Sequence, residues 1–595
     1  GAAGLAALPP APLATAFTRP LAPAERAWLD ATLARLSLRD RVAQLVTVWV
    51  LGDYAHVQDS SFARAREWIV RDHVGGMVMS LGSPLETAAK VNALQKLAMA
   101  NGPGLPLLVS SDVEPGLGRL EGGVYVPYLW SAGTATVLPT NMATGAATLG
   151  SGTPDVDAAA LGRITGRESR AVGIHMAYAP TVDVNNNPAN PVINVRSFGE
   201  DPAAVARLAA AFVRGVQDEG VAAVAKHFPG HGDTDADSHV ALPVVRSDRA
   251  RLNAVELVPF RAAIAAGVVG IMTAHIALPA VAPGGVPATL ERSVMTGLLR
   301  DTLGFRGITV TDAMTMEGVG QGYPITRSGP MALAAGDDIL LMPSDVPAML
   351  DAIVAAVGRG EIPEARVNEA ARRVLELKLR TGAATRPLVD LDSLREIVGA
   401  PAHWQTARDV AQRAVTLLRD SAALLPLATG TPIVLVQYAP DAEVTAGTAF
   451  AHELRRAGAR VVRELRVSPR TSTAALDTLA AALPADARLV VTTYTRTFEG
   501  AGRLAIPAHV SAWIDGQAAR TGRVVVVAGG NPYVIRQFPR VQSYMVTYGR
   551  GDALERAAAR AVLGLAPIGG RAPISLPGYF QRGDGLVRGA AVGAR

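Results

Sequence analysis

The stretch VAAVAKHFPGHGDTDADSH, residues 221–239, decides how the rest of the chain is interpreted. Its small apolar residues lead directly into Lys226 and His227, and a proline and two glycines then interrupt any regular structure. Three of the ten histidines in the chain fall in this stretch, together with three aspartates. Only four of the 57 lysine and arginine residues are lysines, so Lys226 suggests a role for a compact, deprotonatable charge at a strand end.

Three interpretations of this cluster are open. A solvated polar loop would need no chemistry at all. A metal site would use the same ligand types, His and Asp. However, the proline and glycines keep His227 and His231 off a common helical face, so the zinc pattern fails and we predict no metal. In the third interpretation Asp237 and His239 point the same way on an extended segment. A carboxylate beside an imidazole fixes the ring tautomer and raises its basicity, as in acid/base dyads.

Length and composition bound the class of protein. A chain of 595 residues is expected to form two or three domains. Apolar residues make up 49% and aromatic residues only 5%, so the core is built from Ala, Val and Leu. The net charge of +5 is spread without a basic block, which argues against nucleic-acid binding. The chain has no cysteine and hence neither a disulfide nor a thiolate metal site. We expect no cofactor.

Residues 1–26 are rich in Ala and Pro and lack a hydrophobic signal region. We interpret them as a tether left after signal removal, which predicts an exported protein (periplasmic, extracellular or lipid-anchored). A clipped or tagged start is the alternative, and with it a cytoplasmic location. No run of about 20 apolar residues occurs, so no membrane span is expected. Nothing in the sequence indicates an oligomer, and we expect a monomer.

Eight short apolar runs alternate with helical patterns in the first two thirds of the chain. Continuous apolar strands separated by helices predict a parallel sheet that is buried on both faces. Eight such units predict a TIM-like (β/α)8 barrel over residues 27–382, with an insertion or a departure from ideal winding before the fourth run. The helical pattern at 364–382 closes this domain. The runs are 45–50, 75–80, 105–112, 175–183, 221–227, 268–275, 307–312 and 338–343.

A second α/β region follows a linker at 383–404. Residues 405–595 begin with a predicted helix, ARDVAQRAVTLLRD (407–420), and continue with five apolar runs separated by helical segments. This pattern predicts a smaller α/β sandwich domain. No convergent catalytic set is visible in this half. The predicted strands are 432–438, 460–465, 488–494, 523–530 and 541–548.

In a TIM-like barrel the chemistry lies at the C-terminal ends of the strands. Many of the apolar runs end on a polar residue, which nominates a pocket rich in carboxylates and histidines. Each of these residues could instead be a strand-end cap or a buried hydrogen-bonding partner. The residues at these ends are Asp112, Asp183, Lys226, His227, His275 and Asp312.

The motif KHFPGHGDTDADSH (226–239) closely resembles the signature of bacterial β-N-acetylglucosaminidases of glycoside hydrolase family 3. Further motifs resemble that family in the same order: GLGRL after Asp112, NPVINVRSFGED, IMTAH, GITVTDAMTMEGV and AGDDILLMP. The end of the chain, PISLPGYF, resembles the end of the family's second domain. The resemblance covers about residues 40–580 and implies a two-domain enzyme that acts on a carbohydrate.

The resemblance also implies a role for each site residue. Asp312 matches the family's nucleophile, His239 its general acid/base, and Asp237 the carboxylate that orients this histidine. The usual Asp-x-Glu-Gly-Gly-Arg turn is replaced here by DVEPGLGRL, which places Arg119 in an altered turn. The positions that match sugar-binding residues are Asp112, Arg119, Arg196, Lys226 and His227.

These roles fit the chemistry of a retaining glycosidase. Such an enzyme needs a carboxylate nucleophile and a separate proton donor, and an imidazole exchanges protons near neutral pH. The glycine-rich loop 230–236 is expected to act as a lid. We therefore expect an exo-β-N-acetylglucosaminidase acting on peptidoglycan fragments or chitooligosaccharides. The alternatives are a family 3 β-glucosidase or β-xylosidase, a phosphorylase that transfers the sugar to phosphate, and a sugar-binding protein on an inactive barrel.

Overall fold

The computed structural model describes residues 16–119, 135–152, 155–481, 483–495 and 505–590. Most of the predicted tether, residues 1–15, lies outside the described residues, and helix α2 spans Pro23–Arg35. The chain forms two compact units that alternate along the sequence. The first comprises Gly1–Thr136, Ala158–Asp183 and Ala206–His403, and the second comprises Val137–Asp157, Val184–Val205 and Trp404–Arg595. The predicted boundaries of 27–382, 383–404 and 405–595 stay a prediction. Two segments inside 27–382, Val137–Asp157 and Val184–Val205, belong to the second unit.

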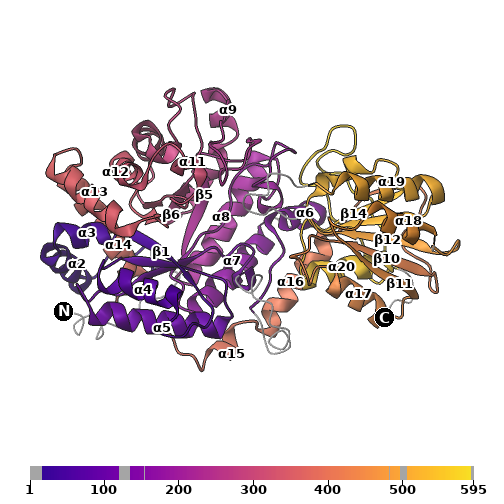
Figure 1. The fold of residues 1–595 in the computed structure, drawn as a ribbon, viewed down its shortest axis with the longest axis horizontal. Coiled ribbons are helices and arrows are strands. Elements are labelled where there is room, and N and C mark those ends of the chain that lie inside the picture. Colours follow the sequence, from indigo (N-terminus) through magenta and orange to yellow (C-terminus); the bar gives the residue numbers. More distant parts are fainter. Residues whose placement is uncertain (1–15, 120–134, 153–154, 482, 496–504, 591–595) are drawn as a thin grey trace. The chain divides into compact units, whose positions relative to one another are not determined.

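An eight-stranded parallel sheet forms the centre of the first unit (Figure 1). Its order is β7-β6-β5-β4-β3-β2-β1-β8, and a bridge between Val310 and Ile339 brings β7 beside β8 and nearly closes the ring. The predicted barrel is thereby confirmed. All eight apolar runs contribute a strand: β1 Val46–Leu51, β2 Gly76–Ser80, β3 Leu108–Ser111, β4 Met176–Ala177, β5 Ala222–Phe228, β6 Gly270–Thr273, β7 Ile308–Val310 and β8 Leu340–Leu341.

Helices surround this sheet and bury its outer face. Ser37 caps the short helix α3, Leu38–Ala43, by accepting the N–H of Asp40, as its position before an amphipathic pattern predicts. Every residue of β5 is buried, because the strand lies between the barrel interior and the helical layer. The main helices between and after the strands are α4 Ser60–Val70, α5 Pro84–Ala100, α7 Val156–Ala171, α8 Pro202–Asp218, α9 Arg249–Ala254, α10 Leu257–Ala265, η5 Ser293–Thr302, α11 Glu317–Gly320, α12 Ile325–Ala335, α13 Val346–Gly358 and α14 Glu364–Arg380.

The fourth strand is much shorter than its apolar run, 175–183, predicts. Regular pairing covers only Met176–Ala177, and Pro180, which has no N–H, follows two residues after Tyr178. Pairing resumes at a single bridge between Thr181 and Lys226. The segment therefore runs beside β5 as an irregular connection that ends at the polar residue Asp183.

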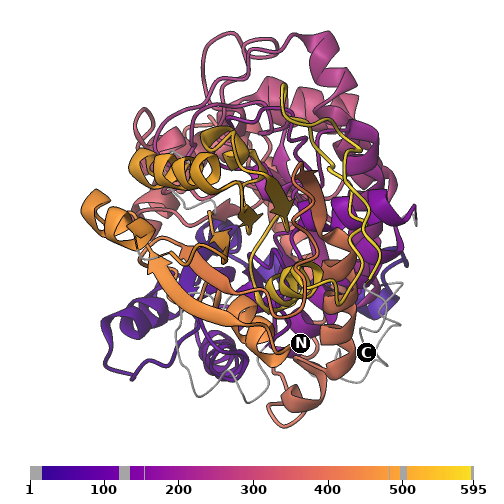
Figure 2. The ribbon, with the colours of Figure 1, turned by 90° about the vertical axis from the view of Figure 1, so that its right-hand side faces the viewer.

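The second unit is a layered α/β domain built on a six-stranded sheet (Figures 1 and 2). The order is β11-β10-β12-β13-β14-β9, and only β9 is antiparallel to its neighbour. Helices α17 and α20 contact each other, as do α18 and α19. The predicted smaller α/β domain is confirmed. Its elements are β10 Ile433–Tyr438, α17 Thr448–Arg456, β11 Val461–Val467, α18 Thr473–Ala481, β12 Arg488–Thr493, α19 Ala508–Thr521, β13 Val524–Ala528, β14 Ser543–Val546 and α20 Asp552–Val562.

The predicted helix 407–420 is wrong in its second half. Helix α16, Pro401–Ala414, ends before the sequence TLLRD, and this sequence forms β9, Thr416–Asp420. A β-branched residue followed by two leucines fits a pleated, half-buried strand, and here it pairs antiparallel with β14 along the edge of the sheet. Tertiary pairing therefore overrides the helical pattern that precedes it.

Candidate active site

The polar strand ends nominated by the sequence lie at one end of the barrel. Asp112 follows β3 directly, Lys226 and His227 lie near the end of β5, and Asp312 comes two residues after β7. The C-terminal ends of parallel strands meet at the same edge of a sheet, so these residues surround the barrel mouth. His275, two residues after β6, joins the same edge.

Lys226 is the cation at the centre of this edge. Its side chain is buried, and its Nζ donates to Asp112 Oδ1 over 2.6 Å and lies 3.2 Å from Glu114 Oε1. The Asp112 side chain stays 39% exposed, so the pair faces the open mouth. Burial alone would raise the pKa of Asp112, but the charges of Lys226 and Arg119 hold it below its ordinary value.

Arg119 and Glu114 complete this corner of the site. Arg119 is exposed, and its Nη1 lies 3.5 Å from the backbone oxygen of Asp112, so the altered turn still brings the guanidinium beside the carboxylate. Sequence reasoning missed Glu114, although it stands two residues after Asp112. The predicted strand end at Asp112 could have indicated Glu114, because a second carboxylate so close to this end can also pair with Lys226. Glu114 also accepts a hydrogen bond from the hydroxyl of Thr181.

Asp183 organises the backbone and one ring of the His-rich stretch. Its carboxylate accepts the N–H of His231 at 2.6 Å and lies 2.8 Å from His227 Nδ1. Burial would raise the pKa of Asp183, but His227, His231 and these hydrogen bonds hold it below its ordinary value. An ionised carboxylate can only accept, so Nδ1 of His227 carries the proton and donates it to Asp183.

Asp237 and His239 form the pair that the spacing predicts, although the backbone differs from the prediction. Asp237 Oδ1 lies 2.7 Å from His239 Nδ1 and accepts the His239 N–H at 2.9 Å. The segment is a turn rather than extended, because the N–H groups of Val240 and Ala241 donate to the Asp237 carbonyl. An aspartate readily holds the residue two positions later in such a turn. The Asp237 side chain is buried, whereas His239 is 26% exposed.

His231 holds the loop that carries this pair. The buried imidazole lies between the hydroxyls of Thr234, at 2.8 Å, and Ser238, at 3.0 Å. Burial lowers the pKa of His231 to about 4, so the ring is neutral near neutral pH. The carbonyl of Ser238 accepts the N–H of Gly318 at 3.0 Å, which joins the loop to the segment after β7. A Cβ at Gly318 would lie only 2.8 Å from that oxygen, so the contact requires glycine.

Asp312 stands among three histidines. Burial would raise the pKa of its carboxyl, but His227, His275 and His239, together with the Ala313 N–H at 2.8 Å, hold it below the ordinary value. The carboxylate is therefore ionised at neutral pH. The His275 ring is held between the Thr289 hydroxyl and the Ala313 carbonyl, and burial lowers its pKa. In such an arrangement the anionic carboxylate can serve as a nucleophile, and the histidine of an oriented Asp–His pair can serve as the proton donor.

Arg196 belongs to the second unit, where it ends the short helix η3, Asn194–Arg196. Its Nη1 donates to the Val192 carbonyl at 3.3 Å. Its predicted contact with the sugar stays a prediction, as do the roles of the other nominated residues.

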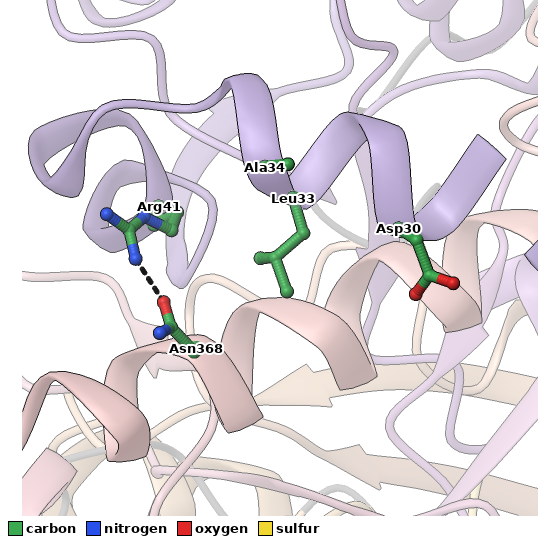
Figure 3. A pocket seen from close by; sticks show the side chains of 5 residues that line it. All are labelled: Asp30, Leu33, Ala34, Arg41 and Asn368. Atoms are coloured by element: carbon green, nitrogen blue, oxygen red, sulfur yellow. Dashed lines mark hydrogen bonds between the residues drawn. The ribbon is translucent and has the colours of Figure 1, made fainter. Parts of the chain in front are cut away.

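A pocket on the outside of the first unit offers no comparable chemistry. It is lined by residues of α2, α3 and α14, and Figure 3 shows Arg41 turned toward Asn368 across it. Arg41 also pairs with Glu364 at 2.8 Å. The lining residues are Asp30, Leu33, Ala34, Arg41 and Asn368. This pocket therefore does not compete with the barrel mouth.

In the part of the chain that the structure describes, no group of three or more His, Asp or Glu side chains is arranged to hold a metal ion. Within the same residues, no helix combines the length and the apolar character that crossing a membrane requires.

Comparison with known proteins relates the sequence to carbohydrate-active enzymes. Residues 37–377 match the family described as "Glycosyl hydrolase family 3 N terminal domain". A Cellulomonas fimi protein named "Beta-N-acetylglucosaminidase/beta-glucosidase" is 30% identical over 92% of this chain and 95% of its own. "Beta-hexosaminidase A" of Pseudoalteromonas piscicida is 34% identical over 62% of this chain and 63% of its own. A solved family 3 β-N-acetylglucosaminidase from Paenibacillus sp. str. FPU-7 is 34% identical, with a TM-score of 0.78 over 91% of this chain and 99% of its own.

Proposed function

Because the chain belongs to glycosyl hydrolase family 3, we propose that it is a retaining exo-β-N-acetylglucosaminidase that removes terminal N-acetylglucosamine from a glycan. The observation that carries this proposal is the Asp237–His239 pair, 2.7 Å between Oδ1 and Nδ1, which the Ser238–Gly318 hydrogen bond joins to the segment that follows Asp312. A carboxylate and a separate proton donor at one barrel mouth are the two groups that such a reaction needs.

In the first step Asp312 attacks the anomeric carbon of the sugar. The low pKa of Asp312 keeps it ionised, and its place just beyond a buried strand limits its motion. The bond from the anomeric carbon to the aglycone oxygen breaks as the new ester bond forms. His239 gives its Nε2 proton to the departing oxygen, and Asp237 stabilises the imidazolium through Nδ1.

In the second step the same histidine acts as a base. Neutral His239 accepts a proton from water, and the hydroxide that forms attacks the anomeric carbon and releases Asp312. Two inversions leave the anomeric configuration unchanged. A histidine suits this position, because its neutral form adds no second negative charge beside the ester.

The remaining polar groups of the mouth are suited to hold the sugar. Lys226 and the two carboxylates beside it offer donors and acceptors to adjacent hydroxyl groups. His227, oriented by Asp183, adds a ring nitrogen to the same edge. A site built to pair with hydroxyl groups rejects analogues that lack them, because its buried polar atoms would then lose their partners.

The names of the relatives support N-acetylglucosamine as the sugar, and the name of the Cellulomonas fimi relative adds β-glucoside as a second candidate. Peptidoglycan fragments and chitooligosaccharides are the natural substrates that we propose. A direct test compares aryl β-N-acetylglucosaminide with aryl β-glucoside, each with and without phosphate. NMR of the first sugar released distinguishes retention from inversion. Faster cleavage of the glucoside, or an α-anomer as first product, would contradict the proposal.

A further inference from the structure

Trp49 is an exposed aromatic residue inside the barrel wall. It lies in the middle of β1, where its neighbours Val48 and Val50 are buried, yet Trp49 is 44% exposed. A tryptophan in a central barrel strand is normally covered, either by the helical layer outside or by the packed layers inside. Its exposure therefore needs an explanation.

Strand register places the Trp49 side chain on the inward face, by two independent routes. In one direction Trp49 pairs with Val78 and Val78 with Ser110, which stands two residues before Asp112. Paired residues of parallel strands, and residues two apart on one strand, point to the same side. Trp49 therefore shares a side with Asp112. Because Lys226 reaches Asp112 from β5, two strands away from β3, that side is the barrel interior.

The second route runs the other way around the barrel. Thr47, two residues before Trp49, pairs with Leu341, and Leu341 stands two residues after Ile339. Ile339 bridges to Val310, which stands two residues before Asp312. Trp49 thus also shares a side with Asp312. The inward residues Thr47, Val78, Ser110, Val310 and Leu341 are all buried. Unlike these five residues, Trp49 is exposed, so it lines the mouth.

The backbone that presents Trp49 is firmly held. Gly52, just after β1, packs so closely against Gly82 that a Cβ on Gly82 would lie 2.4 Å from the Gly52 carbonyl carbon. The Gly52 N–H also donates to the Ser80 carbonyl. Lys90 of α5 donates to the Leu51 carbonyl at 2.8 Å and pairs with Asp53 at 3.1 Å. A contact surface that is ordered before the ligand arrives costs less entropy on binding.

We propose that Trp49 forms the apolar wall of the sugar subsite, on which the C–H face of the N-acetylglucosamine ring stacks. Trp49 lies two strands from β3 and two strands from β7, so roughly 10 Å of wall separates its strand from the strand of Asp112 on one side and of Asp312 on the other. The polar residues of the mouth match hydroxyl groups, whereas the C–H face of a sugar needs an apolar partner. An indole offers the largest such surface of any side chain.

This inference rests on the proposed function, and the experiment separates the two. Aryl β-N-acetylglucosaminide kinetics are measured for the wild type, Trp49→Phe, Trp49→Ala and a control, Trp68→Phe on the outer helix α4. Stacking that persists in the transition state predicts a KM roughly tenfold higher for Trp49→Ala with kcat little changed. Trp49→Phe keeps an aromatic face, so its KM stays within about threefold of the wild type. Trp68→Phe leaves both constants unchanged.

Intrinsic fluorescence supplies a readout that needs no catalysis. Titration with N-acetylglucosamine, and separately with glucose, should change the emission of the wild type and of Trp68→Phe, and the change should vanish in Trp49→Phe. A wild type that cleaves no aryl β-N-acetylglucosaminide overturns the proposed function, and the two titrations still test the wall. If the emission change persists in Trp49→Phe, or no sugar changes it, or Trp49→Ala keeps the wild-type KM, the Trp49 proposal is wrong.

Discussion

The two ends of the barrel each bury a lysine, and they treat it differently. At the mouth, Lys226 meets two carboxylates, Asp112 and Glu114. At the opposite end, Lys378 of α14 is fully buried and donates to one neutral partner, the Gln44 side chain, at 2.6 Å. Gln44 stands two residues before β1, and the charge of Lys378 also contributes to the low pKa of His175, just before β4. Burial lowers the pKa of Lys378 to about 7.

The carboxylates repeat the contrast. At the mouth, Asp183 and Asp312 are held ionised by histidines. Just before β8, at the other end, Asp338 pairs with Arg300, Arg366 and Arg373, while neither oxygen of the adjacent Asp337 has a hydrogen-bond partner. Burial raises the pKa of Asp337 well above its ordinary value. Perturbed pKa values therefore occur at both ends. The mouth is distinguished by partly exposed titratable side chains, Asp112 and His239, beside the buried ones.

The largest effect should come from Asp312→Asn. Removing the nucleophile is expected to lower the turnover of aryl β-N-acetylglucosaminide by about four orders of magnitude or more. The fold should survive, because Asn keeps the size of the side chain and its carbonyl oxygen can still accept the Ala313 N–H. Steady-state rates with a thermal melt as control check this. Near wild-type turnover in a folded variant would show that the mouth holds charge for another purpose.

His239→Ala should rank second, with a loss of roughly two to four orders of magnitude. The loss depends on the leaving group, because an aryl group of low pKa departs without a proton and a sugar does not. Asp237→Asn should show a smaller rate loss with the same dependence on the leaving group, since Asp237 fixes the tautomer of His239. Rates plotted against leaving-group pKa, with and without EDTA, measure this. Equal losses for all leaving groups, or a wild type that EDTA inactivates, would refute the dyad.

The two lysines offer a matched pair. Lys226→Met should lower kcat/KM by about 10- to 100-fold, because it removes a charged donor and leaves two carboxylates unpaired. Lys378→Met should keep the wild-type kcat/KM and gain stability at neutral pH on the order of a few kcal/mol, at about 1.4 kcal/mol per pKa unit. Reversed outcomes would show that the reactive end of the barrel has been misassigned.

The pH dependence of stability sharpens the Lys378 comparison. The pKa of Lys378 in the folded state, about 7, is below its ordinary value of 10.5. Between these values the unfolded chain binds a proton that the folded chain lacks, so the contribution of Lys378 raises the free energy of unfolding as pH rises from 7 to 10.5. Lys378→Met has no such proton. Denaturant unfolding of both proteins across this range measures the difference, and parallel curves would contradict the lowered pKa.

Asp337→Asn should have the smallest effect on activity, because it replaces a buried, unpartnered carboxyl by a neutral group of the same shape. Its effect on stability has a defined sign. The folded pKa is raised, so the folded chain holds the proton more tightly and wild-type stability falls as pH rises above the ordinary carboxyl value. The variant lacks this loss, and its advantage in free energy of unfolding should grow with pH. A constant difference would show that Asp337 finds a partner.

Local sequence predicts much of this arrangement, and long-range register accounts for the rest. Apolar runs that end in Asp112, Lys226 or Asp312 predict strand ends at one barrel edge without knowledge of the pairing. The Asp237–His239 contact follows from a spacing of two, although a turn rather than an extended segment produces it.

Other features depend on which strands become neighbours. Within LVTVWV, Trp49 looks like one more core residue, and only the closure of β1 between β2 and β8 places it on the open inner face. Glu114 pairs with Lys226, which lies on a strand more than a hundred residues later in the chain. The helical pattern of 407–420 changes to strand at Thr416, because β14 offers an edge there.

The placement of the lysines has a practical consequence. Lys90, Lys226 and Lys378 are buried, and only Lys96, on the outer helix α5, is exposed. Reagents that acylate lysine side chains should therefore attach at Lys96, which lies on an outer helix rather than at the barrel mouth. A dye, a biotin or a solid support could be coupled to this one lysine in one step, giving a uniformly oriented catalyst whose substrate entrance stays clear.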